Sequence, residues 1–167
     1  MTTAKDLIDQ LDVSWAALKT LQPRVEAGVP WPVSEKFDTA PEAYWYPPEV
    51  LAHVSELLDR WLGVVNTVVA GSPEPVPFGT AGPNPARLAG IEHNRHLPIP
   101  ELYALIGRGV AAMRARITLL TEADLAKRGR HVAREETTVG EILAGSVTGH
   151  LEEHVRQIGE LLAAAGR

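Results

Sequence analysis

Apolar residues recur every three or four positions in four segments of this 167-residue chain. The segments cover residues 3–28, 48–69, 100–120 and 138 onward, and this spacing gathers the apolar side chains on one face of each predicted helix. Residues 28–47 form a connector rich in proline and aromatic residues, and residues 71–98 contain too many prolines to form a packed element. No segment shows a convincing strand pattern. The sequence therefore predicts an all-α fold: a four-helix bundle with long crossover loops, built as one domain over residues 1–167.

Local signals place the helix ends. Thr3, Thr121 and Thr138 are each followed three residues later by an acidic residue, the pattern of a capping box at a helix start. Gly71 is expected to end the second helix, and Pro23 to mark the end of the first. The turn that starts after Thr121 is expected to be short and to end near residue 129.

The two connectors have different compositions. Residues 28–47 are rich in proline and aromatic residues, which either line a pocket or cover one end of the bundle. Residues 71–98 are predicted to be a solvated loop. His93 and His96 lie in this loop, and a rival metal site could form there if the chain made a helical turn. The loop could also close over a pocket and supply His93, Arg95 or His96 to a substrate.

Composition excludes several classes of chemistry. There is no cysteine, so disulfides, cysteine nucleophiles and cysteine-ligated zinc are ruled out. The formal net charge is −5 and no basic run exists, which disfavours binding to nucleic acid. There is no apolar run of 18 residues and no signal-peptide core, so we expect no membrane span and a cytoplasmic location.

Three histidines lie at the borders of predicted apolar helix faces. His150 and His154 are four residues apart, so both rings lie on one side of the last helix, next to Leu151 and Ile158. His53 has the same place on the second helix. Buried polar rings need partners, because an unsatisfied polar group costs roughly 1–3 kcal/mol. A shared metal ion, hydrogen bonds in the core, or a water-filled cleft would each supply them.

A wider pattern resembles a known family. The segments Trp45-x-x-x-Glu49-Val-Leu-Ala-His53, Thr138-Val-Gly-Glu-Ile-Leu and His150-x-x-x-His154-x-x-Gln-Ile resemble the DinB-like superfamily. This superfamily includes bacillithiol and mycothiol S-transferases and the metal-binding domain of mycothiol-dependent maleylpyruvate isomerase. Tyr46 departs from the serine or threonine that usually follows the tryptophan. The resemblance implies that His53, His150 and His154 bind one divalent metal, often zinc or nickel, in a protein that is frequently a homodimer.

Three neutral imidazoles would leave a fourth metal position open, as in catalytic sites. Since the chain has no cysteine, a thiolate at that position would come from a low-molecular-weight thiol such as a mycothiol-like cosubstrate, and it would attack an electrophile. The resemblance thus implies a metal-dependent thiol S-transferase.

Other interpretations stay open. Glu49 and Glu153 are candidates to orient the imidazole N–H groups, or are ordinary solvated carboxylates. The alternative functions are a non-catalytic metal- or ligand-binding stress-response bundle and a bundle with merely hydrogen-bonded core histidines. Metalloprotease chemistry fits poorly, because Leu151 stands where that motif has glutamate.

Overall fold

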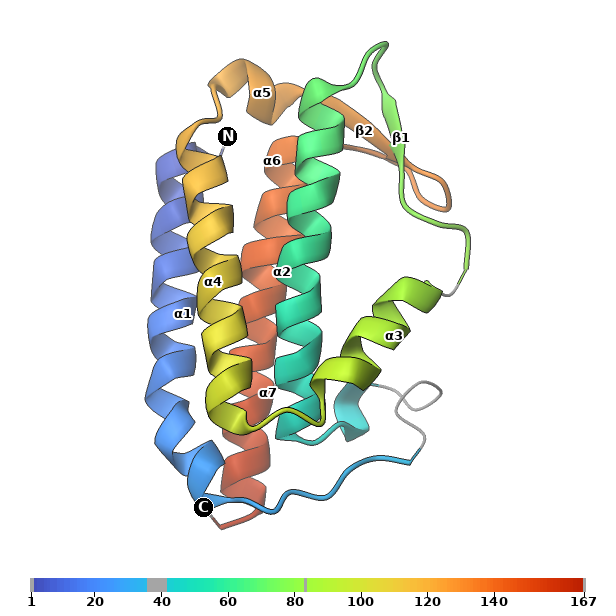
Figure 1. Cartoon of the computed structure of the whole chain (residues 1–167). Helices are drawn as coiled ribbons and strands as arrows, with labels where there is room; N and C mark the ends of the chain where they lie inside the picture. Colours follow the sequence, from blue (N-terminus) through green and yellow to red (C-terminus); the bar gives the residue numbers. More distant parts are fainter. Residues whose placement is uncertain (1, 36–41, 83, 167) are drawn as a thin grey trace.

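Four long helical segments pack side by side and form the body of the protein (Figure 1). The computed structural model describes residues 2–35, 42–82 and 84–166. The four segments are α1 (Ala4–Ala27), α2 (Pro47–Ala70), α4 (Ile99–Thr118) and the last one, which joins α6 (Val139–Glu141), the π-helix η2 (Ile142–Gly149) and α7 (His150–Ala164). The predicted four-helix bundle is confirmed.

The order of the helices in the bundle differs from a simple series of hairpins. α1 packs against α4 and α7, and α2 also packs against α4 and α7. In Figure 1, α1 and α7 run downward whereas α2 and α4 run upward, so the neighbours α2 and α4 are parallel. A parallel pair cannot be joined by a tight turn. Residues 71–98 make the predicted crossover, from the top of α2 to the bottom of α4.

The predicted starts of the capped helices are confirmed. The hydroxyl oxygens of Thr3, Thr121 and Thr138 accept backbone N–H groups at 3.2, 3.1 and 3.2 Å, and each capping box is complete. The predicted stop at Pro23 is wrong, because α1 continues to Ala27. Val25 in this last turn is fully buried, and its carbonyl oxygen accepts a hydrogen bond from the indole N–H of Trp31 at 2.8 Å, which holds the turn in place.

The second connector is more ordered than predicted. It contains the strand β1 (Val76–Phe78) and the helix α3 (Pro85–Asn94), where we expected an irregular, solvated loop. The side-chain oxygen of Asn84 caps α3 by accepting two backbone N–H groups at 3.1 and 3.2 Å, and Pro85 suits a first helical turn, where its missing N–H costs nothing. Buried Ile91 fixes α3 to the bundle. His93 therefore lies on a helix.

A small sheet also contradicts the expectation of no strand. β1 pairs in parallel with β2 (Arg128–His131), which pairs antiparallel with β3 (Glu136–Thr138). The strands are too short to show an alternating pattern in the sequence, but buried Val76 and Phe78 attach the sheet to the bundle.

The short helix α5 (Glu122–Ala126) ends before residue 129, which belongs to β2.

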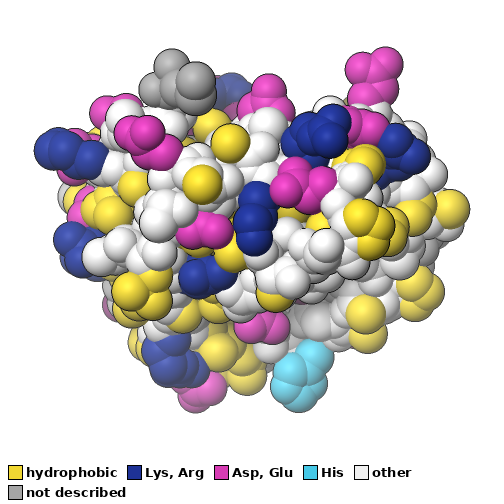
Figure 2. Space-filling view, turned by 90° about the horizontal axis from the view of Figure 1, so that it is seen from above, with side chains coloured by type: hydrophobic (Ala, Val, Ile, Leu, Met, Phe, Trp, Pro, Cys, Tyr) yellow, Lys and Arg dark blue, Asp and Glu magenta, His cyan; other side chains and the backbone are white. Residues whose placement is uncertain are grey.

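Composition predicts no membrane span and disfavours binding to nucleic acid. Among the described residues, no helix combines the length and the apolar character needed to cross a lipid bilayer. Figure 2 shows the end of the bundle that carries α5, where basic and acidic side chains are interspersed. This end of the described structure presents no extended surface of one charge.

Candidate metal centre

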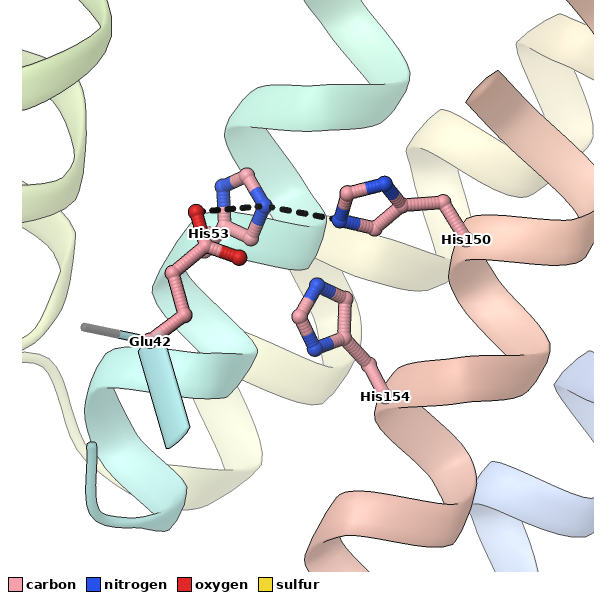
Figure 3. A group of neighbouring side chains, drawn as sticks. All are labelled: Glu42, His53, His150 and His154. Atoms are coloured by element: carbon pink, nitrogen blue, oxygen red, sulfur yellow. Dashed lines mark hydrogen bonds and ion pairs between the residues drawn. The ribbon is translucent and has the colours of Figure 1, made fainter. Parts of the chain in front are cut away.

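The three predicted histidines meet in one place. His53 comes from the second turn of α2, and His150 and His154 come from successive turns of α7, which packs antiparallel to α2 (Figure 3). The Nε2 atoms of His53 and His150 are 3.3 Å apart. Glu42, from the short 3₁₀ helix η1 (Glu42–Tyr44), adds a carboxylate oxygen 4.0 Å from His53 Nε2. We call these four side chains the histidine cluster.

The spacing of the histidine cluster fits a single metal ion. One ligand atom from each of its four residues lies within 4.8 Å of the others. Two nitrogens bound to one tetrahedral metal at about 2.0–2.1 Å would stand roughly 3.3 Å apart, which is the observed separation of His53 Nε2 and His150 Nε2. The Nε2 atom of His154 is buried and has no hydrogen-bond partner among the described residues. A metal ion between the rings would supply that partner.

A side chain one turn further along α7 sets the orientation of His154. The Gln157 amide N–H donates to the backbone carbonyl of Glu42 at 2.7 Å, so its amide oxygen is the group that lies 2.9 Å from His154 Nδ1. This oxygen can only accept, and His154 Nδ1 must therefore carry the ring proton. The tautomer leaves the Nε2 lone pair free to bind a metal, which is how hydrogen bonds to ligand histidines usually act.

His53 is held from two sides. Its Nδ1 atom lies 3.6 Å from a carboxylate oxygen of Glu56, one turn ahead on α2, and Arg60 Nε donates to the other Glu56 oxygen at 2.8 Å. The buried indole of Trp45 packs edge-on against the His53 ring, with centroids 5.5 Å apart. Glu56 is thus the carboxylate next to His53, and Trp45 shields the ring from solvent.

The π-helix η2 ends immediately before His150. Its i→i+5 turns are wider than those of an α-helix and change the angle between successive side chains around the helix axis. The side-chain positions expected for a regular α-helix therefore apply only from His150 onward. Within η2, the buried Thr148 hydroxyl donates to the side-chain oxygen of Gln10 on α1 at 2.8 Å. Packing against α1 thereby holds the unusual turn that presents His150 to His53.

Electrostatics favour neutral rings at His150 and His154. Burial, reinforced by the charge of His53, lowers the pKa of His154 to about 4, and the same two causes lower the pKa of His150. Burial alone would raise the pKa of Glu42, but His53 and Arg87 outweigh it, so that the pKa of this carboxyl is lowered. Neutral imidazoles beside an ionised carboxylate are the forms that bind metal ions.

The two predicted supporting carboxylates have different surroundings. Glu49 is buried, and its oxygens accept hydrogen bonds from Arg95 at 2.9 Å and from the backbone N–H groups of Ser34 and Tyr46 at 2.6 and 2.7 Å. These contacts fix the start of α2 to α3 and the first connector. Glu153 is exposed and lines a cavity of about 300 Å³ that also touches His150 and His154.

The rival histidines lie apart from the histidine cluster. His93 and His96 are both exposed, and His96 Nε2 lies 3.1 Å from the carboxylate of Glu92. Among the described residues, the histidine cluster is the one group with the spacing of a metal site. Arg95 does not face a substrate cavity but forms the buried pair with Glu49.

A larger pocket opens beside the histidine cluster. It has a volume of about 620 Å³ and is bounded by Glu42, His53 and His150, by Trp61 of α2, and by residues of β1, β2 and the chain around α3. We call it the side pocket.

Sequence reasoning missed Glu42, Glu56 and Gln157. The motif around the last two histidines included Gln157, but Glu42 lies in an irregular connector where no periodic signal marks it.

The sequence and the fold resemble those of known proteins. The sequence model of the DinB superfamily matches residues 32–158. No curated protein matches the sequence. Two solved structures have the same fold at low identity. One is the mycothiol-dependent maleylpyruvate isomerase, with a TM-score of 0.64 and 16% identity over 95% of this chain. This chain covers 64% of that isomerase.

The second structure is YfiT from Bacillus subtilis, described as a probable metal-dependent hydrolase with an unusual four-helix bundle topology. It has a TM-score of 0.64 and 17% identity, and the match covers 95% of this chain and 89% of YfiT. A histidine-to-alanine mutant of the isomerase matches equally well, with a TM-score of 0.63 and 15% identity. At these identities the structures establish the common fold.

Proposed function

Because this chain belongs to the DinB superfamily, we propose that it binds one divalent metal ion at His53, His150 and His154 and uses it to transfer a low-molecular-weight thiol to an electrophile. The observation that carries the metal proposal is the buried Nε2 atom of His154, which has no hydrogen-bond partner in the described parts of the chain and stands beside two other imidazoles. Burying such an atom unpaired costs roughly 1–3 kcal/mol, and a metal ion would remove that cost.

Zinc and nickel are the proposed metals. Imidazole nitrogens suit zinc, nickel, iron and copper, so the donor set alone does not distinguish them. A metal in this place, when bound, lowers the pKa of a thiol or water that joins it. The absence of cysteine means that the thiol must come from outside the chain. Dependence on mycothiol is a property of the isomerase neighbour, and a mycothiol-like cosubstrate is our proposal for this chain.

The chain's own residues would handle the proton. Glu42 stands at the mouth of the histidine cluster, lines the side pocket and is paired with Arg87. One oxygen of its carboxylate lies within the same group of atoms as the three imidazoles, so that Glu42 is placed to accept the proton that the thiol loses. The sulfur then forms a bond to the electrophilic carbon, and the leaving group departs with the electron pair of the broken bond. The side pocket has room for the electrophile beside His53 and His150.

Elemental analysis of tag-free protein tests the metal site. We expect about one equivalent of zinc or nickel in the wild type, and a strong loss in His53→Ala, His150→Ala and His154→Ala. His93→Ala is the matched control, because this exposed histidine lies outside the cluster. Wild-type protein that takes up neither metal, even after incubation with both, would disprove the proposal. Assays of thiol transfer and of ester or amide hydrolysis on the metal-loaded protein then separate a transferase from a hydrolase.

One observation favours the second candidate, a metal-binding bundle without catalysis. Glu42 offers a fourth ligand atom within the same 4.8 Å group as the three histidines. Four protein ligands would close the site, which is typical of structural rather than catalytic metal centres. A large loss of metal affinity in Glu42→Gln would favour this closed site. Unchanged affinity with lost thiol transfer would favour the open site and the proton-accepting role.

Three further expectations remain proposals. We propose a cytoplasmic homodimer that acts on small molecules and does not bind nucleic acid.

A further inference from the structure

We propose that the side pocket binds a small carboxylate with a flat apolar body, and that Arg60, Arg134 and His131 hold its carboxylate group. The inference rests on the proposed function in one respect: it identifies the electrophile as a carboxylate. The binding itself needs only the pocket and can be measured without metal or thiol.

One wall of the side pocket is aromatic. Trp61 of α2 packs edge-on against Phe78 of β1 with ring centroids 6.3 Å apart, and Phe78 packs edge-on against His131 of β2 at 5.3 Å. All three rings line the pocket. The guanidinium of Arg60 lies over the Trp61 ring, 4.9 Å from its centroid. This wall gives a planar apolar group a surface to stack on, next to a fixed positive charge.

The same wall presents hydrogen-bond donors that the protein leaves free. Arg60 uses its Nε atom for Glu56, and its two terminal nitrogens make no hydrogen bond to the described residues. The side chain of Arg134 makes none within the described chain either. His131 Nδ1 accepts the backbone N–H of Ala133 at 3.1 Å, so the neutral ring carries its proton on Nε2.

The Nε2 edge of His131 lies over Gly79, another residue of the pocket wall. A Cβ added at Gly79 would be 2.3 Å from this nitrogen, so the glycine makes the close approach possible. The charges of Arg134 and Arg60 also act on His131, after burial, in lowering its pKa. Both arginines line the same pocket as the ring, and the neutral ring can donate without adding charge.

The charge of the pocket wall differs from that of the whole chain. The chain has a formal net charge of −5, but the pocket is lined by three arginines and one carboxylate. Arg60 is paired with Glu56 and Arg87 with Glu42, whereas Arg134 has no ion pair among the described residues. This excess of positive charge attracts ligands of the opposite sign. A guanidinium fork matches the two oxygens of a carboxylate, and the aromatic wall selects a flat body behind it.

Calorimetric titration with cinnamate tests the inference, because cinnamate combines a carboxylate with a flat apolar body. The protein is titrated both metal-free and zinc-loaded. We expect cinnamate to bind to both, and the neutral cinnamamide to bind at least tenfold more weakly. Arg134→Gln and Arg60→Gln should each weaken cinnamate binding roughly tenfold or more, since hydrogen bonds between charged groups are lost. Arg114→Gln, an exposed arginine paired with Asp12 on the far side of the bundle, is the matched control.

Three results would overturn the inference. The first is no binding of cinnamate at millimolar concentration. The second is equal binding of the acid and the amide. The third is binding that requires zinc and is unchanged in Arg134→Gln and Arg60→Gln, which would place the carboxylate on the metal. Circular dichroism of Arg60→Gln checks that the variant folds, and exposed Arg134 gives an independent variant. Cinnamate binding by a protein that takes up no metal would support this inference while the proposed function failed.

Discussion

Replacing Gln157 with leucine should weaken metal binding without removing any metal ligand. In the structure, the Gln157 side chain connects the Nδ1 atom of His154 to the backbone carbonyl of Glu42, through hydrogen bonds of 2.9 and 2.7 Å. Leucine has a similar size but cannot accept the Nδ1 proton. The His154 ring is then free to carry its proton on Nε2, and in this tautomer Nε2, the nitrogen that faces the other two imidazoles, cannot bind metal.

The size of the effect follows from the burial of His154. Only 4% of this residue is exposed, so water cannot easily replace the lost hydrogen bond. Hydrogen-bond partners of ligand histidines typically contribute 10- to 100-fold in metal affinity. This corresponds to about 1.4–2.7 kcal/mol, and an unpaired buried nitrogen costs a comparable amount. We therefore expect the zinc dissociation constant of Gln157→Leu to rise by a factor in this range.

Competition with a chromophoric chelator measures the affinity. Gln157→Glu retains an oxygen for the His154 Nδ1 proton and should keep most of the affinity, although it cannot donate to the Glu42 carbonyl. Gln22→Leu, a half-buried glutamine on α1 far from the histidine cluster in the sequence, controls for the change in composition. If Gln157→Leu bound zinc as tightly as the wild type, the argument that this side chain sets the tautomer would be refuted.

Three other perturbations test the structure. The metal-free protein should lose stability as the pH falls from about 6.5 to about 4. Burial lowers the pKa of His154 to about 4 in the folded protein. Over this pH range the unfolded chain therefore takes up a proton at His154 that the folded protein does not, which favours unfolding. The loss is on the order of 3 kcal/mol for this residue, and urea unfolding of His154→Leu should depend less on pH over the same range. Gly79→Ala should lower the free energy of unfolding by about 1–2 kcal/mol, because the glycine has a φ of +82° and the new Cβ would meet His131. Gly63→Ala, whose Cβ would have open space within α2, should instead raise it by about 0.5–1 kcal/mol in the same thermal unfolding experiment. Glu49→Gln should destabilise the protein by about 3–5 kcal/mol, since it breaks a buried ion pair, while chelator competition shows unchanged zinc affinity. A weaker affinity with unchanged stability would instead assign this carboxylate to the metal site.

The sequence by itself determined the features that depend on near neighbours in the chain. Apolar residues at helical spacing predicted the four long helices, and the threonines at positions 3, 121 and 138 predicted where capped helices begin. The same spacing placed His53, His150 and His154 at the edges of buried faces. Each of these inferences uses residues three or four positions apart, whose relative places are fixed by the geometry of one helix.

The tertiary structure alone decided which distant groups meet. Glu42 reaches the histidine cluster from an irregular connector, and its carbonyl oxygen accepts a hydrogen bond from Gln157, which is 115 positions away. The π-helix before His150 contacts α1 through the hydrogen bond from Thr148 to Gln10, and the helical spacing of its residues does not predict its wider turns. The side pocket needs β1, β2 and α3, which are short elements held by buried residues rather than by their own periodicity. Such contacts form only when the whole bundle packs, because the free energy that fixes them comes from burial between segments far apart in the sequence.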